Sequence, residues 1–543
     1  MNNINIEFKE NDMANKITVR STAIIINDYE MGDCPQLENK FYVWDPIRHK
    51  KEAFGMYYDE ENHKLYIPAG QPLWQIRRDL EERYYDSISS ITPIRFNEPI
   101  KMKSKPRDEE QFQALQFMCG LGEYEDNQYA HQLSVNLQTG KGKTFCTIGT
   151  LCFFGVKAII ITASNTLLTQ WKDEILKYTT LTDKQIVQIK GSDNINWILH
   201  DRSKLANNAC VYLCSHGTLS SYGKRYGWDK VYDLFEFLGI GIKAFDECHS
   251  NFNNMLMIDF FSNVEKTYYI SATPARSDWQ ENRIFQRSYS DVPAINLFKE
   301  DSDPHTNYIA LKYNSCPSAN QISACRHPVY GLNRPAYMEY ITQNQNFYKM
   351  MHIVINDFVI PVRLKGGKVL IYIGTNEGIL RVYKWLAEKY PQFLGEIGIF
   401  TSISTKEEKM RDKNKGIILS TTKSAGAGED IKGLKLTIVA AEPFRSSVLA
   451  QQTLGRTRDN NTFYLELVDL GFKKIRDYYY AKLPVFNKYA ESTSDSVFDR
   501  YELSRRAEII EDDISKKGES PIFLYDERIE AIEQAKDSIS NEE

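Results

Sequence analysis

The sequence predicts an α/β fold with two tandem parallel-sheet units, a small β-rich region in front of them and a helical tail behind. Between about residues 107 and 298, apolar runs of strand length alternate with helical patterns. Such alternation is typical of a parallel sheet with helices on both faces. A second alternating region begins near residue 368. The predicted segments are 1–97 (β-rich), 98–300 (first unit), 301–480 (second unit) and 481–543 (helical, acidic).

Composition limits the class of protein. The chain has 543 residues, 42% hydrophobic and 26% charged, which suits several folded domains rather than a disordered chain. The longest apolar run, residues 151–163, is interrupted by Lys157 and is too short to span a bilayer. The nine cysteines form no C-x-x-C pair, so neither a zinc cluster nor a disulfide framework is predicted. We expect an intracellular protein, cytoplasmic in a bacterial host if a phage encodes it.

The net charge of −5 argues against non-specific binding of polyanions by the whole surface. Any nucleic-acid site must therefore be a local basic track.

The first 97 residues read as a small β-rich accessory region. Short strands are predicted at 41–44, 54–58 and 64–68, with a hairpin turn at 59–63 and a helix at 72–85. The aromatic side chains at strand spacing either form a core or stack on nucleic-acid bases.

Residues 138–144 read Gln-Thr-Gly-Lys-Gly-Lys-Thr, between a short strand (133–137) and an apolar helix (145–156). This is the context of a phosphate-binding loop, in which glycines let backbone N–H groups surround phosphate oxygens at a helix N-terminus. Leu137 stands where the G-x-x-x-x-G-K-[ST] pattern has its first glycine, and the alternative is a flexible surface turn. The predicted nucleotide-binding residues are Thr139, Gly140, Lys141, Gly142, Lys143 and Thr144.

Four buried strands of the first unit are predicted at 157–162, 209–213, 241–245 and 267–271. The third is followed by Asp246-Glu247-Cys248-His249. Asp246 can hold the Mg²⁺ that Thr144 ligates, and Glu247 can deprotonate the water that attacks the γ-phosphate. The alternative is an acidic strand end that meets solvent.

These acidic residues, followed by Ser271-Ala272-Thr273-Pro274, resemble motifs II and III of superfamily 2 helicases of the Asp-Glu-x-His kind. Residues 164–171 resemble motif Ia and 215–219 resemble motif Ib. The resemblance implies that Ser164, Ser215 and Thr218 contact a nucleic-acid backbone, whereas small hydroxyl side chains also serve as helix caps.

Arg107, Gln111 and Ala114 resemble the family's adenine-reading Q motif, although the spacing from Arg107 to Gln111 is one residue longer than in that motif. The resemblance implies that Gln111 reads adenine.

The second unit has predicted strands at 368–373, 395–400, 416–420 and 436–440, and it contains no phosphate loop. The resemblance implies two RecA-like lobes, of which this is the second. Residues 422–430 resemble motif V, which implies contacts from Thr422 to nucleic acid and from Gly428 and Asp430 to nucleotide.

Residues 451–458 resemble motif VI, whose pattern is Q-x-x-G-R-x-x-R, with Gln452 and Arg456 at matching positions. The final arginine of the pattern falls on Asp459, and Arg458 is one residue early. Either Arg456 or Arg458 would therefore neutralise the charge that develops on the γ-phosphate. A following helix at 472–489 either contacts nucleic acid or packs, and two charged helices are predicted after about residue 495.

The resemblance covers about residues 107–470 and favours the branch of UvsW-type phage helicases with their excision-repair and poxviral relatives. It implies ATP and Mg²⁺ as cofactors and movement along nucleic acid without sequence preference. DNA, single-stranded or branched, is favoured over RNA as the track, and a monomer is favoured as the oligomeric state. The alternatives are a duplex translocase that remodels a protein complex such as a stalled polymerase, and an ATP-gated clamp with weak hydrolysis.

Overall fold

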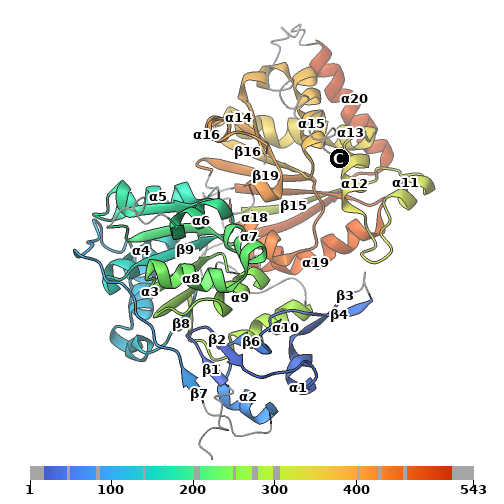
Figure 1. Ribbon diagram of the computed structural model, residues 1–543. Coiled ribbons are helices and arrows are strands. Elements are labelled where there is room, and N and C mark those ends of the chain that lie inside the picture. The colour runs from blue at the N-terminus through green and yellow to red at the C-terminus, as the bar shows by residue number, and fades with distance from the viewer. Residues whose placement is uncertain are drawn as a thin grey trace, which may run out of the picture. The chain divides into compact units, whose positions relative to one another are not determined.

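The computed structural model describes residues 17–45, 49–80, 86–137, 141–165, 167–200, 208–248, 252–271, 279–297, 306–401, 403–425, 431–456 and 462–516. The chain divides into two compact units, Met1–Glu300 and Asp301–Glu543 (Figure 1).

The first unit is built on a parallel sheet of seven strands in the order β10-β11-β9-β12-β13-β8-β14. The strands are β8 (Gln132–Leu137), β9 (Ala158–Thr162), β10 (Ile186–Ile189), β11 (Val211–Ser215), β12 (Ile242–Asp246), β13 (Lys266–Ser271) and β14 (Ala294–Leu297). The four strands predicted for this unit are confirmed as β9, β11, β12 and β13. The apolar patterns at the two edges of the sheet were too short to predict β10 and β14.

Helices cover both faces of this sheet, which is why its central strands are apolar at successive positions. Ile160 of β9 packs in a core with α3 (Glu109–Cys119), α4 (Lys143–Phe154) and α5 (Leu167–Tyr178). Its neighbours Ile159 and Ile161 point to the opposite core. That core includes residues of α6 (Ser192–His200), α7 (His216–Tyr226), α8 (Asp229–Leu238), α9 (Phe252–Phe260) and α10 (Trp279–Ser288).

The N-terminal region forms a second, mostly antiparallel sheet in the order β5-β6-β2-β1-β7. Its strands are β1 (Ile17–Val19), β2 (Ala23–Ile26), β5 (Tyr57–Asp59), β6 (Lys64–Pro68) and β7 (Asp86–Ile88), and beside them lie the hairpin β3 (Tyr42–Asp45) and β4 (Lys50–Ala53) and the helices α1 (Pro35–Glu38) and α2 (Leu73–Leu80). The sequence pattern does not predict β1, β2 or β4, and the strand predicted at 54–58 begins only at Tyr57.

Some aromatic side chains of this region are core residues, whereas Trp44 and Trp74 are exposed (48% and 60%). Tyr66 is 3% exposed and stacks on Phe261, with 4.8 Å between ring centroids. Phe41 is fully buried in the core that also contains one face of the parallel sheet. The packing alternative therefore describes both side chains, and the N-terminal sheet shares a core with one face of the parallel sheet of the same unit.

A buried polar network joins the N-terminal sheet to β12. Lys243 of β12 donates to Asp259 Oδ1 (2.6 Å) and to Ser262 Oγ (2.6 Å), and both charged side chains are almost completely buried. The Tyr269 hydroxyl donates to the other oxygen of Asp259 (2.9 Å), and the hydroxyl of Thr22, in the turn between β1 and β2, donates to the Asp259 carbonyl (2.8 Å). Burial raises the pKa of Asp259 and lowers the pKa of Lys243, and the ion pair opposes both shifts.

The second unit is a parallel sheet of seven strands in the order β17-β18-β16-β19-β20-β15-β21. The strands are β15 (Thr306–Tyr313), β16 (Lys368–Ile373), β17 (Ile397–Phe400), β18 (Ile417–Ser420), β19 (Leu434–Ala441), β20 (Thr462–Asp469) and β21 (Ser492–Val497). The helices are α11 (Ala319–Ala324), α12 (Arg334–Ile341), α13 (Gln345–Val354), α14 (Ile360–Leu364), α15 (Asn376–Lys389), α16 (Lys406–Asp412), α17 (Thr422–Ala425), α18 (Ser447–Leu454), α19 (Lys473–Tyr489) and α20 (Arg500–Lys516). The predicted fold class is thereby confirmed.

The C-terminal part of this unit differs from the prediction. Residues 492–497 read Ser-Thr-Ser-Asp-Ser-Val and form β21, which pairs with β15 alone and is exposed along its length. An edge strand needs no apolar face, so its sequence carries no strand pattern. The helical prediction from about residue 495 is wrong up to α20, which begins at Arg500.

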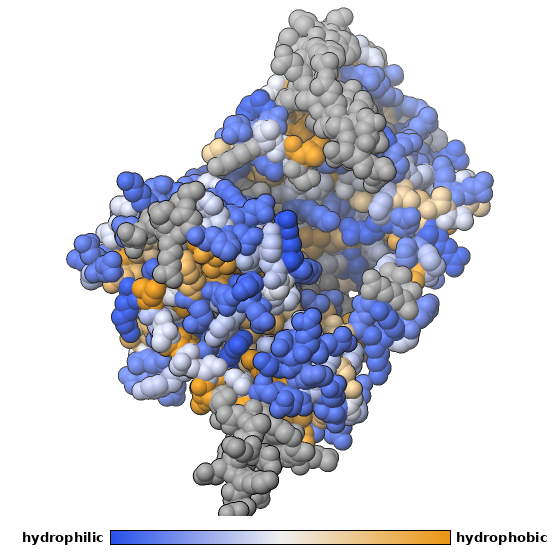
Figure 2. All heavy atoms as spheres, in the orientation of Figure 1, coloured by the Kyte–Doolittle hydropathy of each residue, from blue (hydrophilic) through white to orange (hydrophobic). Residues whose placement is uncertain are grey.

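On the face shown in Figure 2 most described residues are hydrophilic, and apolar ones lie in small groups. No helix among the described residues is both long and apolar enough to cross a membrane.

We predict that Asp259→Asn destabilises the first unit by about 3–5 kcal/mol, because it leaves the buried Lys243 ammonium without its counter-charge. Urea unfolding followed by tryptophan fluorescence measures the effect. The matched control is Asp233→Asn, which breaks the exposed pair with Lys230 and should change stability by about 0.5 kcal/mol or less. An equal loss of unfolding free energy in Asp259→Asn and Asp233→Asn would contradict the prediction.

Candidate functional site

The site lies at the carboxyl-terminal edge of the parallel sheet in the first unit. Lys143 is the first residue of α4, which follows β8, and Glu247 directly follows β12. The Lys143 ammonium lies 2.6 Å from Glu247 Oε1, and both side chains are mostly buried (11% and 18% exposed). The fold therefore joins two predicted residues that are 104 positions apart.

The N-terminus of α4 is open to an anion. Gly142 is the N-cap residue of the helix, with a φ of +93°, and as a glycine it has no side chain with which to cap the first turn. A Cβ atom at Gly142 would come within 2.2 Å of the Gln111 side-chain nitrogen, so this position requires glycine for both its backbone conformation and its close contact. A bare helix N-terminus beside a lysine ammonium fits a phosphate group.

Gln111 fixes the position of this loop. Its backbone N–H donates to Asp108 Oδ1 (2.9 Å), which caps α3. The Gln111 side chain accepts from the Arg107 backbone N–H (2.9 Å) and donates to the Lys141 carbonyl (3.3 Å), and it is 4% exposed. Lys141 also pairs with Glu110 (3.2 Å). The predicted adenine-reading residue thus touches the phosphate loop directly.

Asp246 and Glu247 occupy different environments although they are neighbours. The Trp171 indole N–H donates to Asp246 Oδ2 (2.9 Å). Burial and the adjacent Glu247 charge raise the pKa of Asp246 to about 6, against the lowering effects of Lys143 and of the Trp171 hydrogen bond. Glu247 has a φ of +55°, a left-handed conformation that side chains rarely adopt and that concentrates at functional sites.

The three hydroxyl residues of the first unit that are predicted to contact nucleic acid lie at or just after the ends of the neighbouring strands β9 and β11. Ser215 caps α7 by accepting from the Thr218 backbone N–H (3.2 Å), and both residues are buried (3% and 5% exposed). The Thr218 hydroxyl also lies 3.5 Å from the side-chain oxygen of Asn165, next to the half-buried Ser164. The capping alternative therefore holds for Ser215, and the nucleic-acid contacts stay predictions.

In the second unit, Thr422 begins α17 and binds a carboxylate that sequence reasoning missed. Its backbone N–H and hydroxyl donate to the two oxygens of Glu442 (2.7 and 2.5 Å). Burial raises the pKa of Glu442, and the two hydrogen bonds from Thr422 oppose that shift. Gln452 of α18 is half-buried and Arg456 is 8% exposed. The sequence signal that could have indicated Glu442 as a candidate site residue is its position directly after the apolar strand β19.

Some predicted residues lie outside the described residues: Thr139, Gly140, Gly428, Asp430 and Arg458, together with His249 and 272–274 of the helicase-like motifs. Thr144 is described as the second residue of α4 and is half-buried.

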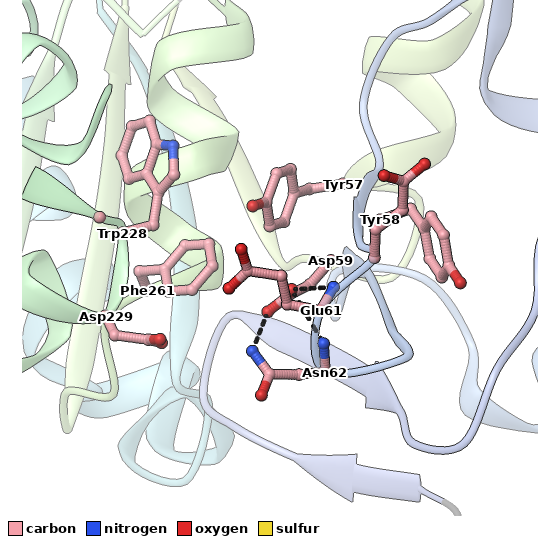
Figure 3. Close-up of a pocket in the computed structure, with 10 residues that line it drawn as sticks. Tyr57, Tyr58, Asp59, Glu61, Asn62, Trp228, Asp229 and Phe261 are labelled. Atoms are coloured by element: carbon pink, nitrogen blue, oxygen red, sulfur yellow. Dashed lines mark hydrogen bonds between the residues drawn. The ribbon is translucent and has the colours of Figure 1, made fainter. Parts of the chain in front are cut away.

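A separate pocket of about 440 Å³ lies in the first unit, between the β5–β6 hairpin turn and the start of α8 (Figure 3). It is lined by Tyr57, Tyr58, Asp59, Glu60, Glu61, Asn62, Gly227, Trp228, Asp229 and Phe261. Four of these side chains are carboxylic acids and none is basic, so the pocket repels phosphate. Base stacking by the hairpin tyrosines is therefore disfavoured, because the carboxylates beside them repel a phosphate backbone.

Across the described residues, no group of three or more His, Cys, Asp or Glu side chains is arranged to hold a metal.

Comparison with known proteins bears on the first unit most directly. Residues 101–276 match the family model described as "Type III restriction enzyme, res subunit". This match spans the phosphate loop, the Lys143–Glu247 pair and the strands that carry them. The "Putative DNA 3'-5' helicase Rad25" of Haloarcula marismortui is 26% identical over 146 residues, 27% of this chain and 20% of that protein. The predicted resemblance to superfamily 2 helicases is confirmed. The Asp-Glu-x-His subtype stays a prediction.

Two viral proteins match longer stretches. The "Transcript termination protein A18" of Yaba monkey tumor virus is 22% identical over 341 residues, 60% of this chain and 64% of that protein. The "Putative helicase 161L" of Invertebrate iridescent virus 6 is 24% identical over 382 residues, 66% of this chain and 77% of that protein. The matched parts thus span a fifth of the Rad25 relative and just under two thirds of A18.

Among solved structures, T4 UvsW aligns over 89% of this chain and 99% of its own, with 14% identity and a TM-score of 0.34. A TM-score this low does not establish a shared fold, so membership of the UvsW-type branch stays a prediction.

We predict that Asp246→Asn raises the melting temperature at pH 8 in metal-free buffer. Because the folded-state pKa of Asp246 (about 6) lies above its ordinary value of 3.8, the folded state binds more protons than the unfolded state between these pH values. Ionised Asp246 therefore costs stability above pH 6, and the cost disappears as the pH falls toward 4. The variant's advantage over the wild type should shrink over that range. A difference in melting temperature between Asp246→Asn and the wild type that does not change with pH would contradict a raised pKa for Asp246.

Proposed function

We propose that this protein hydrolyses ATP to move along nucleic acid, as a helicase or translocase. The observation that carries the proposal is the Lys143–Glu247 pair at the open N-terminus of α4, inside the region that matches a helicase-type family model. Helicase-type domains bind nucleotide, and the features of this helix N-terminus fit the phosphates of ATP.

In the proposed reaction, the Lys143 ammonium binds the β- and γ-phosphates and Gln111 contacts the adenine. Thr144 and Asp246 would hold Mg²⁺, which supplies charge neutralisation on the phosphate oxygens when it is bound. Glu247 accepts a proton from the water that attacks the γ-phosphorus. Because Lys143 is now paired with Glu247, phosphate binding must draw the ammonium away and free the carboxylate for this role.

We propose that an arginine of motif VI, Arg456 or Arg458, supplies a second positive charge that neutralises the charge developing on the γ-phosphate. Arg456 is a buried residue of the second unit (8% exposed). Gln452, Gly428 and Asp430 would belong to the same nucleotide-facing surface. Cycles of ATP binding and hydrolysis would then drive steps along one strand.

We propose DNA, single-stranded or branched, as the track, contacted through the backbone by Ser164, Ser215, Thr218 and Thr422. The name of the relative "Putative DNA 3'-5' helicase Rad25" supports this choice of DNA, and the name "Putative helicase 161L" supports nucleic acid as the track. Backbone contacts imply little sequence preference and a strong dependence on salt.

A second candidate is a duplex translocase that displaces a protein complex without separating strands. The relative named as a transcript termination protein favours it. Strand-displacement assays on forked and blunt DNA separate the two candidates, because only a helicase releases a labelled strand.

We predict that Lys143→Ala abolishes ATP turnover and nucleotide binding, because the variant loses the phosphate-binding ammonium. Glu247→Gln should bind ATP but reduce turnover by at least about a hundredfold, since it cannot accept the proton. Steady-state phosphate release and nucleotide binding measure the two effects. The control is Lys177→Ala, which removes an exposed lysine from α5 and should behave as the wild type. Turnover by Lys143→Ala, or wild-type hydrolysis by Glu247→Gln, would contradict the proposed chemistry.

A further inference from the structure

Trp171 has a contact that its place in the core does not require. It lies on α5, is 3% exposed, and packs with Leu168 and Ile175 on the buried face of that helix. This packing fixes the direction of the indole ring. The ring N–H then donates to Asp246 Oδ2 at 2.9 Å.

A buried indole N–H needs an acceptor, and most buried donors find a backbone carbonyl or water. Here the acceptor is one oxygen of a carboxylate at the end of β12, 75 residues away in the sequence. A hydrogen bond to one oxygen fixes the rotation of a carboxylate about its last side-chain bond. The other oxygen, Oδ1, is then held in one orientation. The same carboxylate is the proposed Mg²⁺ ligand.

The helix that carries Trp171 also begins at the proposed nucleic-acid side of the unit. The Leu167 backbone N–H bonds to the Ser164 carbonyl (3.3 Å), and the Leu168 backbone N–H bonds to the Asn165 carbonyl (3.4 Å). Asn165 in turn lies 3.5 Å from the Thr218 hydroxyl. Trp171 is four residues after Leu167, the first residue of α5, which is about 6 Å along a helix at 1.5 Å per residue. A shift of α5 at its start would therefore move the indole N–H relative to Asp246.

We propose that Trp171 is the positioning residue that orients the Asp246 carboxylate for Mg²⁺ and connects that carboxylate to the N-terminal end of α5, which follows Ser164 and Asn165. This inference rests on the proposed function and adds a residue to its site. It is a positioning role, because Trp171 acts on the metal and the nucleotide only through Asp246.

The test measures binding and does not depend on turnover. Fluorescence anisotropy of N-methylanthraniloyl-ADP is recorded against Mg²⁺ concentration for the wild type, Trp171→Phe, Asp246→Asn and the double variant. Phenylalanine keeps an aromatic ring in the core and removes only the donor. We expect Trp171→Phe to raise the Mg²⁺ concentration for half-maximal binding about tenfold, the effect of one hydrogen bond to a charged group.

A double-mutant cycle separates positioning from packing. In the Asp246→Asn background, Trp171→Phe should shift the Mg²⁺ midpoint less than twofold, because its effect passes through the missing carboxylate. Trp228→Phe is the matched control: its ring stacks on Phe261 in the same unit, and it should leave the midpoint unchanged. Trp171→His, which keeps a ring N–H, should give a midpoint between those of the wild type and the phenylalanine variant.

A wild-type midpoint in Trp171→Phe would overturn the inference and leave the proposed function intact. An equal shift with and without the Asp246 carboxylate would overturn it in favour of a packing role. Absence of Mg²⁺-dependent binding of labelled ADP by the wild type would overturn the proposed function and this inference together.

A second readout tests the connection to α5. The ratio of ATP turnover with single-stranded DNA to turnover without it should fall in Trp171→Phe and not in Trp228→Phe. An unchanged ratio would overturn the proposed connection.

Discussion

The ion pair between Lys143 and Glu247 is the interaction on which the proposed chemistry depends. It exists because β13 lies between β8 and β12 and all three strands run in the same direction. Their carboxyl ends therefore meet at one edge of the sheet, two strand spacings or about 10 Å apart. A lysine at the start of α4 can cross that distance to a carboxylate after β12. The proposed ATP site thus follows from strand order and direction.

The N-terminal region contributes to the same framework. Its sheet shares a core with one face of the parallel sheet, and the Lys243–Asp259 network connects it to β12, the strand that ends at Asp246. The acidic pocket beside the β5–β6 turn is at odds with a nucleic-acid contact at that place. We therefore regard the N-terminal region as a structural support for the parallel sheet of the first unit.

Sequence patterns predicted the parts of the fold that are apolar and buried. The strand predicted at 368–373 is β16, residue for residue, because a central parallel strand is apolar throughout. The polar edge strand β21 had no such pattern. Motif spacing indicated Lys143, Asp246 and Glu247, since each follows an apolar element at a known offset. It could not indicate the hydrogen bond from Trp171 to Asp246, because contacts between helices and distant strands leave no local pattern.

The same limit applies to the second unit, where Thr422 was predicted from its motif but its partner Glu442 was not. The pairing arises because β18 and β19 end at the same edge of the sheet, on either side of β16. The positive φ of Glu247 is likewise invisible in the sequence, since nothing in a glutamate marks a left-handed backbone.

The most direct test of the account is steady-state ATP hydrolysis by the wild-type protein, alone and with single-stranded DNA, duplex DNA, branched DNA and RNA. The account predicts that hydrolysis requires Mg²⁺ and that a DNA, single-stranded or branched, stimulates it most. Negligible hydrolysis with every nucleic acid offered would contradict it and would favour an ATP-gated clamp.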